Sequence, residues 1–218
     1  MHDQQIITGP RNRNIKVWDS RSRECQRTLL GHKVACSVSA STPSSSNSSL
    51  FVWDKASWTV VRELVDHAAG VLDLAFSPTL FLSCSKDTSI KIWVRHDGSL
   101  LCTIAGHLSP VNALELSIQP LSTLIPGHIT SSSSSLQAQS LLSASGDSSM
   151  KLWDTHSGQL IRTFEGHLRG LASLKLVKHN QQIISGSNDE TIKIWNLLSG
   201  QCLHTAHPPR PLRPPPIP

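Results

Sequence analysis

The sequence contains no tyrosine, no Cys-x-x-C pair and no long apolar run. Its longest apolar stretches are four or five residues, as around Leu80–Leu82, which excludes a transmembrane span. The start of the chain also lacks the charged and apolar pattern of a secretory leader. Charged residues make up only 16% of the 218 residues and apolar residues 38%, so we expect a folded, soluble protein of the cytoplasm or nucleus.

The cysteines are few, odd in number and scattered, which favours free, buried thiols in a reducing compartment. They are Cys25, Cys36, Cys84, Cys102 and Cys202. A metal site is the less favoured alternative, and we expect no metal and no cofactor. The formal net charge of +5 permits an anionic partner without requiring one.

Tryptophan, in contrast, is abundant and periodic. Five of the six tryptophans end a short alternating segment, at successive spacings of 35, 40, 60 and 42 residues; they are Trp18, Trp53, Trp93, Trp153 and Trp195. Segments such as Ile192–Trp195 alternate with the period of two that is typical of a β-strand. A period near 40 with a Trp-Asp ending indicates one four-stranded propeller blade per repeat.

Further residues stand at fixed positions in these repeats. A turn residue lies six positions before each tryptophan: Asn12, Asn47, Asp87, Asp147 and Asp189. A hydroxyl lies four positions before the turn in four repeats: Thr8, Ser83, Ser143 and Ser185. Gly-His pairs open repeats at His32, His107 and His167, and Asp66–His67 opens another. The fixed offset favours a tight turn, because Asp and Asn form local hydrogen bonds there.

This combination resembles the WD40 family, in which a His, a strand Ser or Thr, a turn Asp and a Trp form a hydrogen-bonded tetrad in each blade. Mapped by motif, three tetrads are complete: His67, Ser83, Asp87 and Trp93; His107, Ser143, Asp147 and Trp153; His167, Ser185, Asp189 and Trp195. Such a set is chemically consistent, because indole only donates and carboxylate only accepts. The resemblance implies an all-β fold, a partial β-propeller of about four to five four-stranded antiparallel blades.

The same Ser, His and Asp could also be interpreted as a hydrolase triad. The set recurs three times, however, which favours architecture over a single active site. No nucleophile-elbow glycine pattern surrounds Ser83, Ser143 or Ser185. We therefore expect no catalytic residues and no enzymatic activity.

The repeats predict the following division of the chain: 1–31, a partial WD repeat; 32–66, a degenerate WD repeat; 67–106, a WD repeat; 107–166, a WD repeat with a Ser-rich insertion at about 118–139; 167–206, a WD repeat; and 207–218, a Pro-rich disordered tail. The degenerate repeat is short and serine-rich over Cys36–Ser49, which predicts a missing or poorly formed strand. In the tail, Pro208–Arg213 could alternatively dock an SH3 groove.

Within the family, residues 6–206 resemble F-box/WD-repeat proteins, the beta-TrCP-like class with fungal relatives. The most distinctive segments are Arg162–Ala172 and Ile183–Asp189. The resemblance implies a protein-interaction scaffold derived from the substrate-recognition propeller of an SCF-type ubiquitin ligase complex. The sequence shows no F-box, so the alternative is a general assembly scaffold with no ubiquitin role.

The expected partner is a protein. In WD propellers the loop after the Gly-His and the turn before the Asp share one face, and that face carries Arg11, Arg13, Lys33, Lys86 and Arg169. Arginine makes bidentate contacts with phosphate, so we predict binding of an acidic or phosphorylated peptide. Ordinary solvated turns are the alternative.

Other partner classes are less favoured. No basic run with interleaved aromatic residues suggests nucleic acid, and nothing suggests a membrane partner. A partial propeller leaves open blade edges, which predicts self-association.

Overall fold

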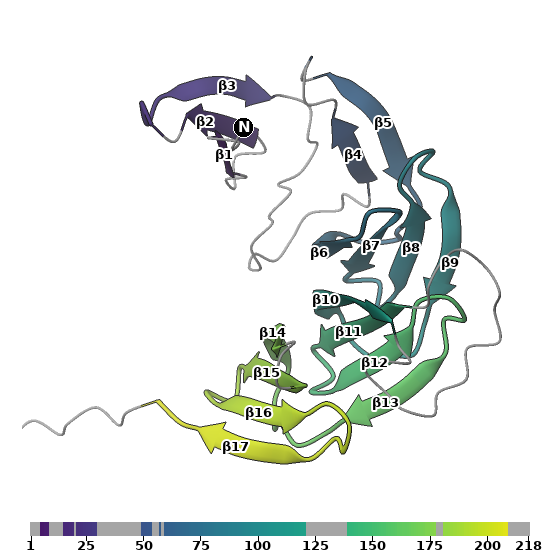
Figure 1. Ribbon diagram of the computed structural model, residues 1–218, viewed down its shortest axis with the longest axis vertical. Helices are drawn as coiled ribbons and strands as arrows, with labels where there is room; N and C mark the ends of the chain where they lie inside the picture. The colour runs from purple at the N-terminus through teal and green to yellow at the C-terminus, as the bar shows by residue number, and fades with distance from the viewer. Residues whose placement is uncertain are drawn as a thin grey trace, which may run out of the picture.

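The computed structural model describes residues 5–8, 15–19, 21–29, 49–53, 57, 59–120, 139–177 and 181–208. Every regular element among these residues is a β-strand (Figure 1), and none of them belongs to a helix that could cross a lipid bilayer. The strands form five antiparallel sheets, which we call blades 1 to 5 in chain order.

Blade 1 consists of β1 (Gln5–Thr8), β2 (Ile15–Asp19) and β3 (Cys25–Leu29), and blade 2 of β4 (Ser49–Trp53) and β5 (Val60–Val65). Blade 3 consists of β6 (Val71–Phe76), β7 (Leu80–Ser85), β8 (Ile90–Val94) and β9 (Leu100–Ile104). Blade 4 consists of β10 (Val111–Pro120), β11 (Gln139–Ser145), β12 (Met150–Asp154) and β13 (Leu160–Phe164). Blade 5 consists of β14 (Leu171–Val177), β15 (Gln182–Ser187), β16 (Ile192–Asn196) and β17 (Cys202–Ala206).

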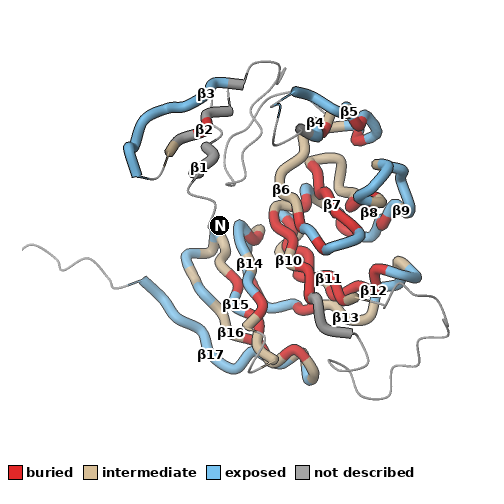
Figure 2. The backbone as a smooth tube through the Cα atoms, turned by 45° about the horizontal axis from the view of Figure 1, so that its top comes forward, coloured by how far each residue is buried: buried red, intermediate tan, exposed pale blue. Residues whose placement is uncertain are grey.

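The blades are arranged as an open arc. Figure 1 shows the first strand of each four-stranded blade on the inside of the arc and the last strand on the outside. The inner strands β6, β10 and β14 contact one another in sequence. Blades 1 and 5 lie on opposite sides of the opening in both views (Figures 1 and 2). The expected fold class, a partial β-propeller of antiparallel four-stranded sheets, is confirmed.

The apolar core lies at the joints between blades. At the joint of blades 3 and 4, Leu82, Ile90 and Ile92 pack against a set that includes Leu141 and Trp153. The joint of blades 4 and 5 repeats this arrangement one blade later, with Leu142, Met150 and Leu152 against Ile183 and Trp195. A smaller cluster joins blades 2 and 3. Figure 2 shows the buried backbone concentrated in blades 3 to 5.

Polar side chains also join the inner strands. The Asp73 carboxylate of β6 accepts the Leu114 N–H of β10 at 2.9 Å, and the Asn112 side chain donates to the Leu171 carbonyl of β14 at 2.7 Å. Burial raises the pKa of Asp73, although the backbone N–H groups of Leu114 and Leu74 partly oppose this. The blades are therefore aligned by specific hydrogen bonds as well as by apolar contact.

Several sequence features lie wholly or largely outside the described residues. They are the serine-rich stretch of the second repeat, most of the Ser-rich insertion and the Pro-rich tail. One expectation needs correction: the described cysteines are free, but Cys25 and Cys202 are exposed instead of buried. They occupy β3 and β17, the last strands of blades 1 and 5, where side chains face solvent.

Shortening an apolar side chain should destabilise the protein more inside a packed joint than at the equivalent position of blade 5. Leu142 and Ile184 stand at the same position of blades 4 and 5, but Leu142 is 1% exposed and Ile184 is 36% exposed. Leu142→Ala should lower the free energy of unfolding by about 3 kcal/mol, because it leaves a cavity in a packed joint. Ile184→Ala should cost less than about 1 kcal/mol. Urea unfolding at low protein concentration measures both, and equal losses would contradict this account of the joints.

Candidate functional site: the protein-binding face

Each of blades 3, 4 and 5 contains a buried chain of four hydrogen-bonded side chains. In blade 4 the Trp153 indole N–H donates to Ser143 Oγ at 2.8 Å, and Ser143 Oγ lies 2.7 Å from His107 Nε2. His107 Nδ1 lies 2.8 Å from Asp147 Oδ2. The serine belongs to β11 and the tryptophan to β12, so the chain ties two strands to the loop before β10 and the turn after β11.

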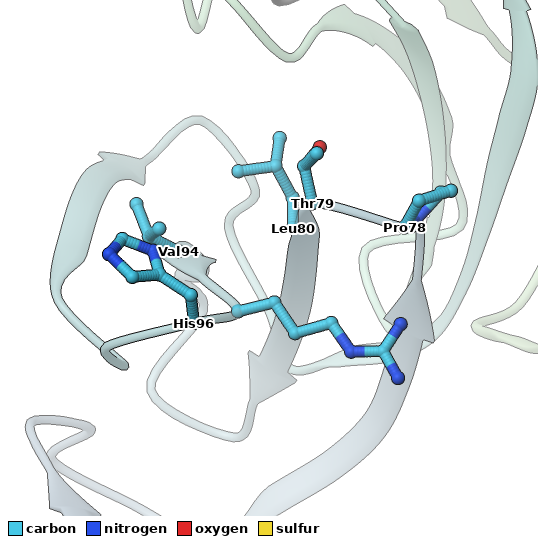
Figure 3. Close-up of a pocket in the computed structure, with 6 residues that line it drawn as sticks. Pro78, Thr79, Leu80, Val94 and His96 are labelled. Atoms are coloured by element: carbon cyan, nitrogen blue, oxygen red, sulfur yellow. The ribbon is translucent and has the colours of Figure 1, made fainter.

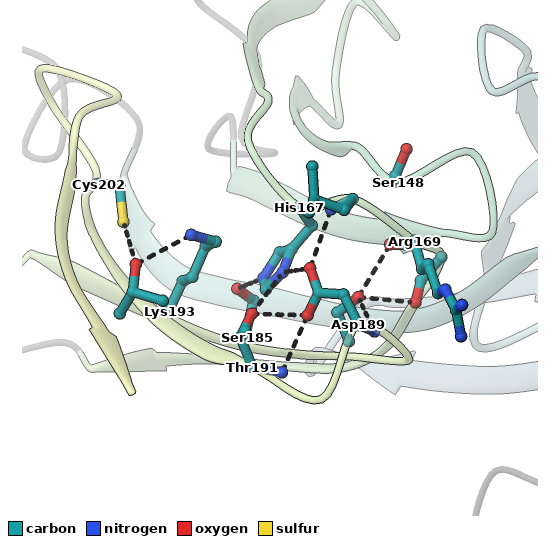
Figure 4. Close-up of polar contacts among 12 residues, drawn as sticks. Ser148, His167, Arg169, Ser185, Asp189, Thr191, Lys193 and Cys202 are labelled. Atoms are coloured by element: carbon teal, nitrogen blue, oxygen red, sulfur yellow. Dashed lines mark hydrogen bonds and ion pairs between the residues drawn. The ribbon is translucent and has the colours of Figure 1, made fainter. Parts of the chain in front are cut away.

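Blades 3 and 5 repeat this geometry closely. In blade 3 the three distances, from Trp93 through Ser83 and His67 to Asp87, are 2.9, 2.8 and 2.9 Å. In blade 5 the distances from Trp195 through Ser185 and His167 to Asp189 are 2.8, 2.7 and 2.8 Å. Figure 4 shows the Ser185, His167 and Asp189 part of this chain. The three serines are at most 1% exposed. They are therefore shielded from any substrate, which supports a structural role over a nucleophilic one.

The donors and acceptors fix the protonation of the histidine. An indole N–H can only donate, so Ser143 Oγ accepts from Trp153 and directs its own proton to His107 Nε2. That nitrogen, at 2.7 Å, is closer than the other acceptor of Ser143 Oγ, the Lys151 carbonyl at 3.4 Å. The remaining ring proton then lies on Nδ1 and is donated to the Asp147 carboxylate. Burial lowers the pKa of His107, and also that of His67, although the facing carboxylates oppose this. The rings are thus kept neutral.

The turn aspartates hold a large set of hydrogen bonds. Burial alone would raise the pKa of Asp147, but bonds from Ser149, from the Leu108 N–H and from His107 outweigh it and hold the pKa at about 2. Asp87 has the same kind of surroundings and a pKa of about 2. The pKa of Asp189 is also lowered, by Thr191, Leu168 and His167 against burial.

Two further hydroxyls per blade belong to this network, and the sequence analysis missed them. One stands two residues after the aspartate and donates to its Oδ1: Ser89, Ser149 and Thr191, at 2.5, 2.7 and 2.6 Å. The other stands two residues before the aspartate and donates to a carbonyl of the preceding loop: Ser85, Ser145 and Ser187. Their regular offset from the aspartate was the available signal.

These networks fix the backbone of one face. Each aspartate also accepts the backbone N–H of the residue after the histidine, which is Ala68, Leu108 or Leu168, at 2.8 to 2.9 Å. Neighbouring blades touch here, because a Cβ added to Gly170 would lie 2.9 Å from the Cα of Gly146. Blades 4 and 5 therefore meet closely at this end, and we call the loops and turns at this end of blades 3 to 5 the turn face.

The structure locates two of the predicted face residues and leaves three outside the described part. Arg11, Arg13 and Lys33 are among the residues not described. Lys86 lies in the turn of blade 3 and is half-buried, and Arg169 lies in the loop of blade 5 and is exposed. Blade 4 separates them, so they do not form one cluster. Figure 4 shows Arg169 of blade 5 and Ser148 of blade 4 together with His167, Ser185 and Asp189.

The turn face also carries two leucines that sequence reasoning missed. Leu108 is 90% exposed and Leu168 is 88% exposed, and they occupy the same loop position in neighbouring blades. Their own N–H groups are the ones that the aspartates hold, so both leucines project from a fixed backbone. Two large apolar side chains that are almost fully exposed at equivalent positions of neighbouring blades make this face a candidate contact surface. Their position directly after a Gly-His pair was the signal.

Comparison with known proteins agrees with this architecture. The family model "WD domain, G-beta repeat" matches residues 58–94, 98–154 and 158–196. The chain belongs to the WD40 repeat family. Its three matched segments contain the Ser, Asp and Trp of all three tetrads.

Individual WD40 relatives share about three tenths of their aligned residues with this chain. It is 29% identical to Autophagy-related protein 16 of Arabidopsis thaliana, over 81% of this chain and 33% of that protein. It is 29% identical to Mitochondrial division protein 1 of Vanderwaltozyma polyspora, over 82% and 23%. It is 28% identical to Nuclear distribution protein PAC1 of Arthroderma otae, over 66% and 30%. The chain spans about a third or less of the length of these relatives.

The other described parts of the blades provide weaker candidates for a functional site. A pocket of about 530 Å³ lies at the opposite end of blade 3, lined by Pro78, Thr79, Leu80, Val94, Arg95 and His96 (Figure 3). None of the predicted tetrad residues or predicted face residues lines it. Across the described ranges, no group of three or more His, Cys, Asp or Glu side chains is placed to hold a metal ion. The turn face is therefore the candidate site.

The tetrads predict a stability that falls in acid. His67 and His107 have folded pKa values below the ordinary 6.5, so the unfolded chain takes up protons first and stability is lost as the pH falls below about 6.5. Asp87 and Asp147 add a further loss between about pH 4 and 2, because their folded pKa of about 2 lies below the ordinary 3.8. The urea midpoint should be lower at pH 5.5 than at pH 7.5.

The matched control is His96→Gln, because the His96 side chain is 80% exposed and lies outside every tetrad. It should keep the pH dependence of the wild type. A urea midpoint that stays constant or rises between pH 7.5 and 5.5 would show that the histidines are not held neutral.

Proposed function

We propose that this chain is a WD40 protein-interaction scaffold whose partner binds on the turn face. The observation that carries the proposal is the pair Leu108 and Leu168, which are almost fully exposed on loops that the tetrads fix. A rigid backbone lowers the ordering cost of binding, and exposed leucines offer apolar area to bury. The tetrads thus stabilise the loop conformation that presents these leucines to a partner.

The chemistry beside the leucines favours an acidic or phosphorylated peptide. Arg169 directly follows Leu168, and its side chain is exposed. The turn aspartate of the same blade, Asp189, is already held by hydrogen bonds to His167 and Thr191. Neither Arg169 nor Lys86 forms an ion pair with a described residue, so both cations are available to an anionic group. Glu190 is the acidic exception in this region.

A partner that suits this surface combines two features. One is an apolar side chain, which would pack beside Leu168, and the other is an acidic or phosphorylated residue next to it, for the guanidinium of Arg169. By their sequence positions, Arg11, Arg13 and Lys33 extend the same basic character in the first two repeats. We include them in the proposal on that ground alone.

The biological setting is proposed as assembly of a protein complex without a ubiquitin role. The relatives are named for autophagy, nuclear distribution and mitochondrial division, and these names contain no reference to a ubiquitin ligase. The ligase-receptor hypothesis therefore depends only on the resemblance of segments such as Ile183–Asp189 to F-box/WD-repeat proteins. The free thiols suit a reducing compartment, so we propose a location in the cytoplasm or nucleus.

The proposal predicts a phosphate preference that depends on Arg169. The probes are Leu- and Ser-containing peptides, each prepared with and without phosphate on the serine, and binding is followed by fluorescence polarisation. The wild type should prefer the phosphorylated form. Arg169→Ala should weaken binding of that form about tenfold or more, because it removes a charge-assisted hydrogen bond. Leu168→Ser should weaken both forms.

Arg95→Ala is the matched control, because Arg95 is an exposed arginine at the opposite end of blade 3. It should bind both peptide forms as the wild type does. A wild type that binds neither form, or equal binding of both forms by the wild type and Arg169→Ala, would contradict the proposal.

A further inference from the structure

Blade 5 has a face that is equivalent to the buried faces of blades 3 and 4, but no described residue buries it to the same extent. In blades 3 and 4 the corresponding face carries Leu82, Ile90 and Ile92 or Leu142, Met150 and Leu152, all at most 1% exposed. The register places Ile184, Ile192 and Ile194 at the same positions of blade 5. Ile184 is 36% exposed, Ile192 is 52% exposed and Ile194 is half-buried. We call these three isoleucines the blade 5 flank.

At each described joint, the same kind of residues from the next blade packs against this aliphatic face. Leu141 and Trp153 of blade 4 cover blade 3, and Ile183 and Trp195 of blade 5 cover blade 4. At the remaining joint, Phe81 and Trp93 of blade 3 pack with Leu50 and Leu64 of blade 2. An aliphatic face therefore meets a tryptophan-bearing face three times. By this pattern, a further tryptophan-bearing blade would complement the blade 5 flank.

Blade 1 has the strand register of such a blade. Trp18 of β2 pairs with Ile6 of β1 and with Cys25 of β3. Trp195 pairs with Ile183 and Cys202 in the same way. Within one molecule, however, blade 1 lies across the opening of the arc from blade 5 (Figure 1). Blade 1 of a second molecule has no such restriction.

We propose that the blade 5 flank binds blade 1 of a second copy of this chain. The contact continues the joint that already links blades 3, 4 and 5, with an aliphatic face on one side and a tryptophan-bearing repeat on the other. It is a head-to-tail contact, so each added copy presents a new blade 5 flank and association can continue beyond a dimer. The turn face takes no part in it, so this proposal is independent of the peptide-binding function.

Sedimentation velocity over a range of concentrations tests the association. The wild type should form dimers and larger species as its concentration rises. Ile192→Lys should remain monomeric, because it places a charge in the joint, and Ile184→Lys should behave in the same way. The matched control is Leu160→Lys, at a position 48% exposed on the outer strand of blade 4, and it should associate like the wild type.

Mixing two variants tests the head-to-tail geometry. Ile192→Lys removes the flank and keeps blade 1, whereas Trp18→Arg removes the tryptophan of blade 1 and keeps the flank. Each should be monomeric alone, and the mixture should form a one-to-one dimer, because one intact joint remains. If Trp18→Arg unfolds blade 1, its flank is still intact and the dimer is still expected.

Three results would overturn the proposal. A wild type that stays monomeric at all concentrations would indicate that the molecule closes on itself or needs no cover. Unchanged association of Ile192→Lys and Ile184→Lys would place the interface elsewhere. Loss of association in Ile192→Lys with no dimer in the mixture would indicate contact between two blade 5 flanks.

Discussion

The hydrogen bond from each indole to a buried serine is the interaction on which the other features depend. It makes the serine an acceptor, which directs the serine proton to the histidine and the histidine proton to the aspartate. The aspartate oxygen that accepts from the histidine, Oδ2, also accepts the N–H of Leu108 or Leu168. The other oxygen, Oδ1, accepts from the turn hydroxyl. Removing one member would leave buried polar atoms without partners, which is costly. The network therefore connects the strand core of each blade to the backbone of the turn face.

The same residues explain why the blades differ in what they leave exposed. A blade has two faces, and the tryptophan face covers the aliphatic face of the blade before it. At each joint between described blades the aliphatic face is covered by the next blade. The aliphatic face of blade 5, the last described blade, is left partly exposed. The turn face is independent of this problem, because its exposed leucines belong to loops and not to a joint. The molecule thus presents two surfaces with different chemistry, one mixed apolar and basic, the other aliphatic.

Much of the fold could be predicted from the sequence because its determinants are periodic. Trp93, Trp153 and Trp195 are each preceded by a serine and an aspartate at fixed distances, which is enough to predict strands, turns and blades. The exposure of Leu108 and Leu168 was missed although both follow a Gly-His pair, because leucine is most often buried and here the loop geometry places it in water. The separation of Lys86 from Arg169 follows from the predicted repeats, since repeat 107–166 lies between theirs, but the half-buried state of Lys86 could not be read from the sequence. The exposure of Cys202 followed from its place on an outer strand.

The most direct test of the central claim is amide hydrogen exchange at Leu108, measured by NMR in the wild type and in Ser143→Ala. Leu108 is an exposed loop residue whose N–H is held by Asp147 at 2.9 Å. If the tetrad fixes the turn face, this amide exchanges slowly in the wild type and much faster in Ser143→Ala, while the Leu168 amide of the neighbouring blade keeps its protection. Fast exchange of Leu108 in the wild type, or a rate that Ser143→Ala leaves unchanged, would contradict the account.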